Sequence, residues 1–516
     1  MAVDAARNHR CVPCVAVADR SRNVLDVGGW PVHRGRRTVG GRWHNAGVSR
    51  AHEAGALHAS AGYRGPEWLV PPEDVNALIP GLWSRNVGKD DHGRLVIAGI
   101  DARTLADQFG TPVYVVDTDD FRARCREFRA GFAGWTIYYA AKAFLTVAIA
   151  RWVHEEGLHL DVCSGGELAI ALHAGFPPER IKFHGNNKSD QELDRAVRVG
   201  VGAIVLDSYD EIGRLSTIAA DRGARPRVFI RVKVGIEAHT HEYIATAHED
   251  QKFGFSLVGG HAQTAAERVL ADPNLELVGL HSHIGSQIFD TQAFEVAARR
   301  VVGLHAQLAE QHGVELPELC LGGGFGIAYT TQDDPEPTEQ LGKELSAIVR
   351  HECQGYGVEP PFLSIEPGRA IAGPAVFTLY TVGTVKSVEL DGAPHWRRYV
   401  AVDGGMSDNI RTALYDADYS CTLASRSSAA EPALSRVVGK HCEAGDIVVK
   451  DEFLPGDIRP GDLLAVPSTG AYCRSMASNY NQVPRPPVVA VTEGEPSLLV
   501  RRETEDDLLR LDLGAS

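Results

Sequence analysis

The sequence lacks any hydrophobic run of membrane-spanning length, although 44% of its residues are hydrophobic. Its first residues, Met1 to Arg7, lack the apolar core of a secretory signal, so we do not expect secretion. It also lacks an excess of positive charge. The 52 Lys and Arg against 67 Asp and Glu give a net charge of −15, which argues against nucleic acid as a partner. The nine cysteines are odd in number and widely spaced, which predicts reduced thiols in a cytoplasmic protein.

Residues 1–50 lack lysine and glutamate and carry nine arginines and three aspartates. This stretch therefore has a charge of 9 − 3 = +6, and the remainder carries −15 − 6 = −21. No helical or strand periodicity persists in it, so we predict a disordered extension; a transit-like segment is the alternative, weakened by the aspartates. Cys11 and Cys14 have no second ligand pair, so no metal site is expected. Our hypothesis is that translation starts at Val48, and peptides from before residue 48 in mass spectrometry would contradict it.

The rest of the chain alternates between apolar segments and helical segments. A length of 516 residues exceeds the size at which single cores stop growing, so two domains are expected. Eight candidate buried strands end in polar or glycine residues, and they are Thr136–Ala140, Leu158–Ser164, Ile181–Gly185, Ala203–Ser208, Val228–Val234, Leu277–Gly285, Leu319–Phe325 and Phe362–Gly368. Eight strands with helices between them predict a (β/α)8 barrel. A doubly wound sheet is the alternative, but no glycine fingerprint opens its first turn.

After Pro374 the helical signal becomes sparse and strands dominate. The predicted strands are Val376–Val388, Arg398–Asp403, Ile447–Lys450 and Leu463–Ala465. Before the barrel, short strands are predicted at Leu95–Ile97 and Val113–Val116, with a helix at Thr104–Phe109. We therefore predict a disordered extension over 1–50, a segment over 51–120 that contributes to the β domain, a barrel over 121–375 and a mostly β domain over 376–513.

Lys142 follows the first barrel strand directly. Burying an ammonium is costly unless it is paired or loses its proton, so a lysine at this position is unusual. A desolvated lysine with a lowered pKa can condense with an aldehyde, and the common biological aldehyde for this purpose is pyridoxal phosphate (PLP). The plainer interpretation is a lysine that reaches out to water at the strand's end.

Other strands also end in polar side chains, and active sites of such barrels lie at these ends. The ends carry Asp161, His184, His281-Ser-His283-Ile-Gly-Ser286, Gly322-Gly-Gly324 and Glu366-Pro-Gly368-Arg369. Each alone has a structural explanation: a tight glycine turn, a structural histidine, or a glutamate that pairs with a nearby arginine. Lysine, histidine, glycine cluster and glutamate in this strand order are harder to explain as structure alone.

These motifs resemble those of fold-type III PLP enzymes, which pair an alanine racemase-like barrel with a β domain. Further motifs resemble the diaminopimelate decarboxylase family, and the resemblance runs from Leu78 to Leu513. They are Glu237-Ala-His-Thr-His-Glu242, Lys252-Phe-Gly-Phe255, Asp403 to Arg411, Gly439-Lys-His-Cys-Glu443 and Gly470-Ala-Tyr472-Cys. The resemblance implies PLP as cofactor, with Lys142 bound to it covalently and His283 stacked on its ring. It implies further cofactor contacts from Asp161, His184, Ser286, Gly324, Gly368, Arg369 and Tyr472.

Glu366 would face the ring nitrogen of PLP and keep it protonated, because an opposite charge stabilises the cation. A protonated ring is the stronger electron sink, which favours decarboxylation; the related alanine racemases place an arginine there. The resemblance implies that Arg369, Arg411, Tyr415, Glu443 and Tyr472 bind the substrate. An acidic side chain would bind the distal ammonium of meso-diaminopimelate, and the guanidinium of an arginine would bind its distal carboxylate through paired hydrogen bonds. For Arg411 the alternative is a surface salt bridge.

In the family, Cys442 and Glu443 reach the site from the second subunit, which implies an obligate homodimer, with Cys442 as the proton donor. For Cys442 the alternative is a small, inert core residue. We expect Arg474 at the edge of the site. The predicted function is PLP-dependent decarboxylation of meso-diaminopimelate to L-lysine, without a metal. The alternatives are a decarboxylase of ornithine or arginine, and a non-catalytic PLP-barrel regulator.

Overall fold

The computed structural model describes residues 65–235, 251–389 and 396–514. The extension predicted over 1–50 and the motif Glu237–Glu242 lie outside these residues. Within the described ranges, no helix has both the length and the apolar character needed to cross a bilayer.

Eight parallel strands close into a barrel, which confirms the predicted fold class and shows that the doubly wound alternative was wrong. The sheet closes because β8 pairs with β9 while β13 pairs with β5. The strands are β5 (Thr136–Ala140), β6 (His159–Val162), β7 (Ile181–Phe183), β8 (Ala203–Leu206), β9 (Arg227–Lys233), β11 (Glu276–Ser282), β12 (Glu318–Cys320) and β13 (Phe362–Ile365). A short strand, β10 (Phe255–Ser256), adds to β9 and was not predicted.

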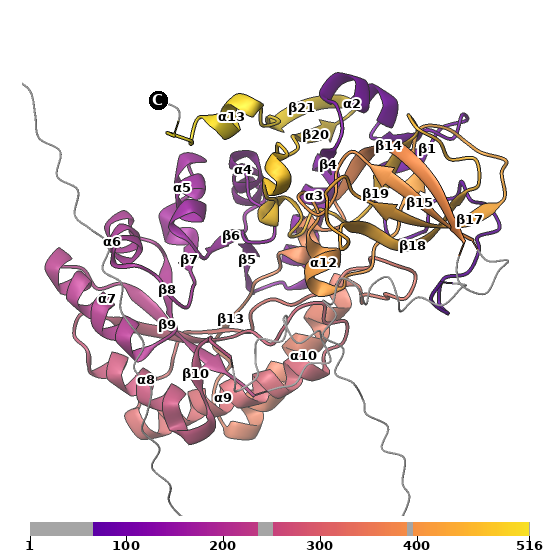
Figure 1. Ribbon diagram of the computed structural model, residues 1–516. Helices are drawn as coiled ribbons and strands as arrows, with labels where there is room; N and C mark the ends of the chain where they lie inside the picture. The colour runs from indigo at the N-terminus through magenta and orange to yellow at the C-terminus, as the bar shows by residue number, and fades with distance from the viewer. Residues whose placement is uncertain (1–64, 236–250, 390–395, 515–516) are drawn as a thin grey trace, which may run out of the picture. The chain divides into compact units, whose positions relative to one another are not determined.

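Helices lie outside the barrel strands, as Figure 1 shows. They are α3 (Thr118–Gly131), α4 (Val147–Glu155), α5 (Gly165–His173), α6 (Asp190–Val199), α7 (Tyr209–Arg222), α8 (His261–Ala271), α9 (Gln292–His312), α10 (Thr338–Tyr356) and α11 (Arg369–Ala372), with the 3-10 turns η1 (Pro178–Arg180) and η2 (Val258–Gly260). Four successive helices start at a hydroxyl side chain that accepts a backbone N–H, namely Thr146, Ser164, Ser189 and Ser208. Such caps stop each strand-to-helix loop at a defined residue and so fix the loops that carry the site.

The remaining strands form a mostly antiparallel sheet and a small three-stranded sheet. The larger contains β4 (Val113–Asp117), β14 (Val376–Glu389), β15 (Trp396–Val402), β16 (Thr422–Leu423), β17 (Pro432–Val438), β18 (Ile447–Pro455), β19 (Leu463–Val466), β20 (Val488–Thr492) and β21 (Glu495–Val500). The smaller contains β1 (Val87–Lys89), β2 (Leu95–Ile97) and β3 (Ile100–Asp101), followed by α2 (Ala102–Phe109). The other short elements are α12 (Arg411–Tyr415), η3 (Arg474–Met476), η4 (Tyr480–Gln482) and α13 (Glu505–Leu509).

Strand β4 joins parts of the chain that are far apart in sequence (Figure 1). It pairs antiparallel with β14, Val116 opposite Val376, and parallel with β20, Tyr114 opposite Val488. All five of its residues are buried, as expected for a central strand covered on both faces. The segment before the barrel is therefore held in the sheet that follows the barrel.

Candidate active site

A cavity of about 430 Å³ opens at the carboxyl ends of the barrel strands. Many of the sequence-predicted residues line it, and these are Lys142, Asp161, His184, His283, Ser286, Gly324, Glu366, Gly368, Arg369, Tyr415 and Tyr472. Arg411, Cys442 and Glu443 of the same chain do not line it. Strand ends that are more than two hundred residues apart thus converge on one site, while the roles assigned to these residues stay predictions.

Lys142 follows β5, and its side chain is exposed to the cavity. The expectation of a lowered pKa for this lysine was wrong, because the pKa of Lys142 is raised. Desolvation lowers the pKa of Lys142, but the electrostatic interactions with Tyr472 and Asp161 outweigh this effect, so the net pKa is raised. The nearby carboxyl of Asp161 is itself buried, and burial raises the pKa of Asp161 to about 6. Lys142 is therefore an accessible ammonium whose charge the site stabilises.

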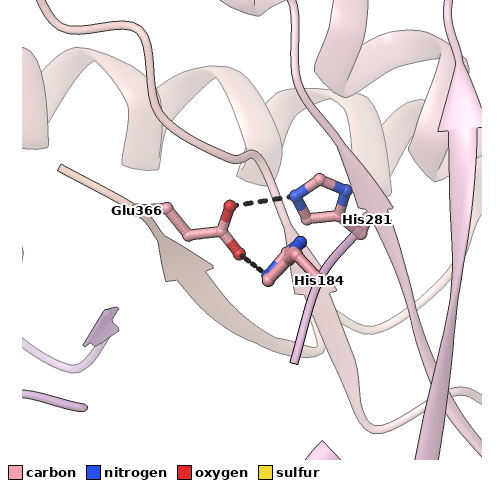
Figure 2. A group of neighbouring side chains, drawn as sticks. All are labelled: His184, His281 and Glu366. Carbon is pink, nitrogen blue, oxygen red and sulfur yellow. Dashed lines mark hydrogen bonds and ion pairs between the residues drawn. The ribbon is translucent and has the colours of Figure 1, made fainter. Parts of the chain in front are cut away.

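Glu366 is 5% exposed and lies between two imidazoles, as Figure 2 shows. Nε2 of His281 is hydrogen-bonded to Oε2 at 3.0 Å, and Nε2 of His184 lies 3.0 Å from Oε1. Burial opposes ionisation, but the two histidines outweigh it and hold the pKa of Glu366 well below its usual range. Burial also lowers the pKa of His281 to about 3, so this histidine donates as a neutral imidazole. The site therefore presents a carboxylate anion.

His184, His281 and Glu366 could also serve as metal ligands, since their ligand atoms lie within 4.8 Å of one another. In the described structure, however, the Nε2 atom of each histidine is already directed at an oxygen of Glu366. A carboxylate held in this way can accept a hydrogen bond from a protonated ring nitrogen of a ligand and stabilise its positive charge, which fits PLP. The sequence-based expectation that no metal is used stays a prediction.

Two residues beside Glu366 were missed by the sequence reasoning about the site. Lys182 on β7 is 0% exposed, and its Nζ lies 3.2 Å from Glu318 and 3.9 Å from Glu366. The Cys320 thiol donates to Glu366 at 3.2 Å. His281 was noted in its motif but was given no role, although it lies two residues before His283 and alternate residues of a strand share a face. That spacing was the available signal, whereas Lys182 had none.

A glycine-rich wall lines another part of the cavity. Gly322 and Gly324 have φ of +70° and +117°, where a side chain is strained. A Cβ on Gly323 would lie 2.3 Å from the Glu366 carbonyl oxygen, and one on Gly324 would lie 2.8 Å from that of Gly285. Bare backbone therefore faces the cavity here, together with the Ser286 hydroxyl. Backbone amides and a hydroxyl are the donors that a phosphate needs, although the Gly323 N–H already donates to Nδ1 of His283 at 3.2 Å.

Arg369 and Arg411 are both 6% exposed, and neither forms an ion pair with a carboxylate within the described ranges. Arg369 donates to the hydroxyls of Ser286 at 2.7 Å and Tyr329 at 2.5 Å. Arg411, at the start of α12, donates to the Tyr419 hydroxyl. The surface salt bridge considered for Arg411 was therefore wrong, because its guanidinium is buried against tyrosines.

Cys442 and Glu443 are exposed on a loop between β17 and β18. Asp446 anchors this loop by accepting the backbone N–H groups of His441 at 2.7 Å and Met406 at 2.6 Å. The alternative of an inert core cysteine at 442 was therefore wrong. Arg474 was expected at the edge of the site, but it is not a lining residue and instead lies near Tyr114, Arg485 and Glu503.

Comparison with known proteins first defines the class. Residues 118–373 match the family model described as "Pyridoxal-dependent decarboxylase, pyridoxal binding domain". This range contains the lysine, the histidines, the glycine wall and Glu366, so PLP is the cofactor that the lining residues fit.

The chain belongs to the diaminopimelate decarboxylase family. It is 55% identical to the diaminopimelate decarboxylase of Mycobacterium leprae over 90% of this chain and 99% of that protein. It is 57% identical to that of Mycobacterium tuberculosis H37Rv over 84% of this chain and 98% of that protein. The crystal structure of diaminopimelate decarboxylase from M. jannaschii in co-complex with L-lysine matches with a TM-score of 0.76 and 31% identity, covering 83% of this chain and 98% of that one.

Proposed function

We propose that this protein decarboxylates meso-2,6-diaminopimelate to L-lysine in the last step of lysine biosynthesis. Bound PLP supplies the electron sink that accepts the pair left when the carbon–carbon bond breaks and carbon dioxide departs. A proton then replaces the lost carboxylate on the same carbon. The reaction needs no oxidant and no metal.

Lys142 would hold the cofactor, because its side chain is the amine exposed in the cavity. Glu366 would hold the proton on the ring nitrogen, since the site keeps this carboxyl ionised and directs two imidazoles at it. His283, which also lines the cavity, would cover one face of the ring. The glycine wall with Ser286 would bind the phosphate, and Asp161 and His184 complete the surroundings.

The observation that carries the choice of substrate is the pair of buried arginines without a carboxylate partner. Leaving a buried guanidinium without a counterion is costly, so a ligand carboxylate is the natural partner. The distal end of diaminopimelate carries such a carboxylate, whereas ornithine has only an ammonium there. Arg369 and Arg411 therefore favour diaminopimelate over ornithine.

The distal ammonium would be bound by Glu443, and the thiol of Cys442 would donate the proton. Both residues are exposed on their own chain, which is compatible with their serving the cavity of a second subunit in a homodimer. Tyr415 and Tyr472, which line the cavity, would complete the substrate contacts. We place this enzyme in the cytoplasm, where its free cysteines stay reduced.

The test is a carbon dioxide release assay on purified protein with PLP and, separately, meso-diaminopimelate, ornithine and arginine. We expect turnover of diaminopimelate to exceed that of the other two substrates by orders of magnitude in kcat/KM. Faster turnover of ornithine would reverse the substrate assignment, and no turnover of any amino acid would favour a non-catalytic PLP-barrel regulator.

The Arg411→Ala variant tests the substrate contact itself. We expect KM for diaminopimelate to rise and kcat/KM to fall by an amount on the order of 2–5 kcal/mol if a buried ion pair with substrate is lost. Near-normal kinetics in this variant would remove Arg411 from the site.

A further inference from the structure

Two buried tyrosines that belong to no motif singled out in the sequence contact these arginines: Tyr329 contacts both, and Tyr419 contacts Arg411. They are 5% and 2% exposed, and their rings meet edge to face with centroids 5.1 Å apart. The guanidinium carbon of Arg411 lies 4.7 Å from the Tyr329 ring centroid and 5.5 Å from that of Tyr419. That of Arg369 lies 5.7 Å from the Tyr329 ring centroid. The tyrosines therefore form a shared aromatic wall for two cations.

Each tyrosine hydroxyl also accepts a hydrogen bond from one arginine. Tyr329 accepts from Nη1 of Arg369, and Tyr419 accepts from Nη1 of Arg411. A guanidinium can be buried without a carboxylate only if polar atoms and aromatic faces compensate for the lost water. Among the described residues, these two tyrosines supply that compensation for Arg411.

The Tyr419 hydroxyl is fixed from its other side by a short chain of hydrogen bonds. Its oxygen lies 3.5 Å from Sγ of Cys473, and that thiol donates to Oδ1 of Asn409 at 3.4 Å. The same Asn409 oxygen accepts the backbone N–H of Arg411 at 3.3 Å. Since the thiol proton is used on Asn409, the Tyr419 hydroxyl donates to sulfur and offers its lone pairs to Arg411. The guanidinium is thus held in one orientation rather than merely solvated.

We propose that Tyr419 and Tyr329 are positioning residues that hold Arg411 and Arg369 ready for the distal carboxylate of the substrate. This inference rests on the proposed function. The Nε atoms of both arginines are buried and have no acceptor among the described residues, so each guanidinium keeps at least one donor for that carboxylate. Guanidinium groups that are already oriented lose less conformational freedom when they bind a carboxylate, so the tyrosines act on affinity.

The primary test is steady-state kinetics of Tyr419→Phe and Tyr329→Phe with meso-diaminopimelate. Phenylalanine keeps the aromatic wall and removes only the hydroxyl. We expect KM to rise about tenfold for Tyr419→Phe, with kcat within about twofold of wild type, as for the loss of one charged hydrogen bond in ground-state binding. Tyr356→Phe, a change at a tyrosine 49% exposed at the end of α10, is the matched control and should leave KM unchanged.

Two further readouts separate positioning from a purely structural role. The inhibition constant of L-lysine, which retains the distal amino acid group, should rise by the same factor, while the PLP dissociation constant stays constant. In the Arg411→Ala background, Tyr419→Phe should add little, because the group it positions is gone.

Three outcomes would overturn the proposal: additive effects of Arg411→Ala and Tyr419→Phe, an unchanged KM in Tyr419→Phe, or a loss of kcat alone in Tyr419→Phe. In each case, turnover of diaminopimelate by the wild-type enzyme would still support the proposed function. Failure of the wild-type enzyme to release carbon dioxide from diaminopimelate would instead overturn both. Melting temperatures of the variants would show whether the fold has been kept.

Discussion

At the scale of single residues, the site works by keeping particular charges in place. Glu366 stays an anion although it is buried, because two imidazoles and a thiol are directed at its oxygens. Lys182 adds a fully buried cation 3.9 Å away, sandwiched between the rings of Tyr138 at 4.0 Å and Phe229 at 4.2 Å. The anion is thus stabilised within the barrel before any ligand arrives.

Replacing Glu366 by glutamine should test this charge. Glutamine keeps the size and can still hydrogen-bond, but it cannot hold a proton on a ring nitrogen. We expect kcat to fall by about two orders of magnitude, because the electron sink is weakened. Glu310→Gln, an exposed position on α9, is the control. Steady-state kinetics near wild type for Glu366→Gln would show that ring protonation is not limiting.

Replacing Lys142 by alanine should abolish turnover and the absorbance band of the lysine-bound cofactor, because the only amine exposed in the described cavity wall is lost. Lys343→Ala on α10 removes an exposed lysine and should change neither. An absorbance spectrum and a carbon dioxide assay on the same samples check both expectations. A persistent band in Lys142→Ala would place the cofactor on another group.

At the scale of elements, the loop between β15 and α12 connects the sheet to the site. Asp408 in this loop accepts hydrogen bonds from the Tyr380 hydroxyl and from the Gly405 N–H, and its backbone carbonyl accepts from the Tyr114 hydroxyl at 2.6 Å. Tyr114 is on β4 and Tyr380 on β14, so the loop is tied to two neighbouring strands. The start of α12 and hence Arg411 take their position from these ties.

The Asp408 carboxyl makes this loop sensitive to pH. Burial raises the pKa of Asp408 to about 7, above the value of 3.8 for an unperturbed aspartate. The folded state therefore binds a proton that the unfolded state releases, and the stability gained from this proton is lost as pH rises through 7. The loss is on the order of 3 kcal/mol between pH 5 and pH 8. Asp408→Asn should remove this component, so its melting temperature should depend less on pH than that of wild type. Parallel pH dependences would contradict the assignment.

Elements with clear periodicity were predictable, and contacts between distant elements were not. The eight barrel strands were found because each is apolar and ends in a glycine or polar residue, although the predicted segments extended into the loops. The strands β17 and β21 were missed, because many of their residues are half-buried or exposed and charged residues are mixed in. Strand β20 was missed although it is apolar and its first four residues are buried. Most cavity residues were found through motifs of the resembled family. Lys182 could not be found, because its partners Glu318 and Ser364 lie 136 and 182 positions further along the chain.

At the scale of the whole molecule, one cavity draws on residues from the barrel, on Tyr415 of α12, on Tyr472 after β19 and, in the proposed function, on a second chain. Tyr472 belongs to the chain that follows β19, yet its backbone N–H donates to the Ala143 carbonyl, next to Lys142, at 2.8 Å. The described part of the chain thus assembles most of one site, and the proposed function assigns the exposed loop with Cys442 to the site of a second subunit.

Mixing two inactive variants tests this sharing. Lys142→Ala and Cys442→Ala should each be inactive, but random reassortment of subunits puts one intact site in each mixed dimer and restores about a quarter of wild-type activity. The measurement is carbon dioxide release after unfolding and refolding the mixture, with each variant refolded alone as the control. No recovery in mixtures that do form mixed dimers would place both residues in the same subunit's site.

The pairing of β4 also has a consequence for biosynthesis. On the ribosome, the apolar residues of this strand are made long before Val376 and Val488, the residues beside which they finally lie. The nascent chain must keep an aggregation-prone strand soluble while the whole barrel is translated, and only the last stretch to leave the exit tunnel covers its second edge. Premature termination anywhere before β20 would therefore release a polypeptide in which β4 has an unpaired edge that can pair with other chains.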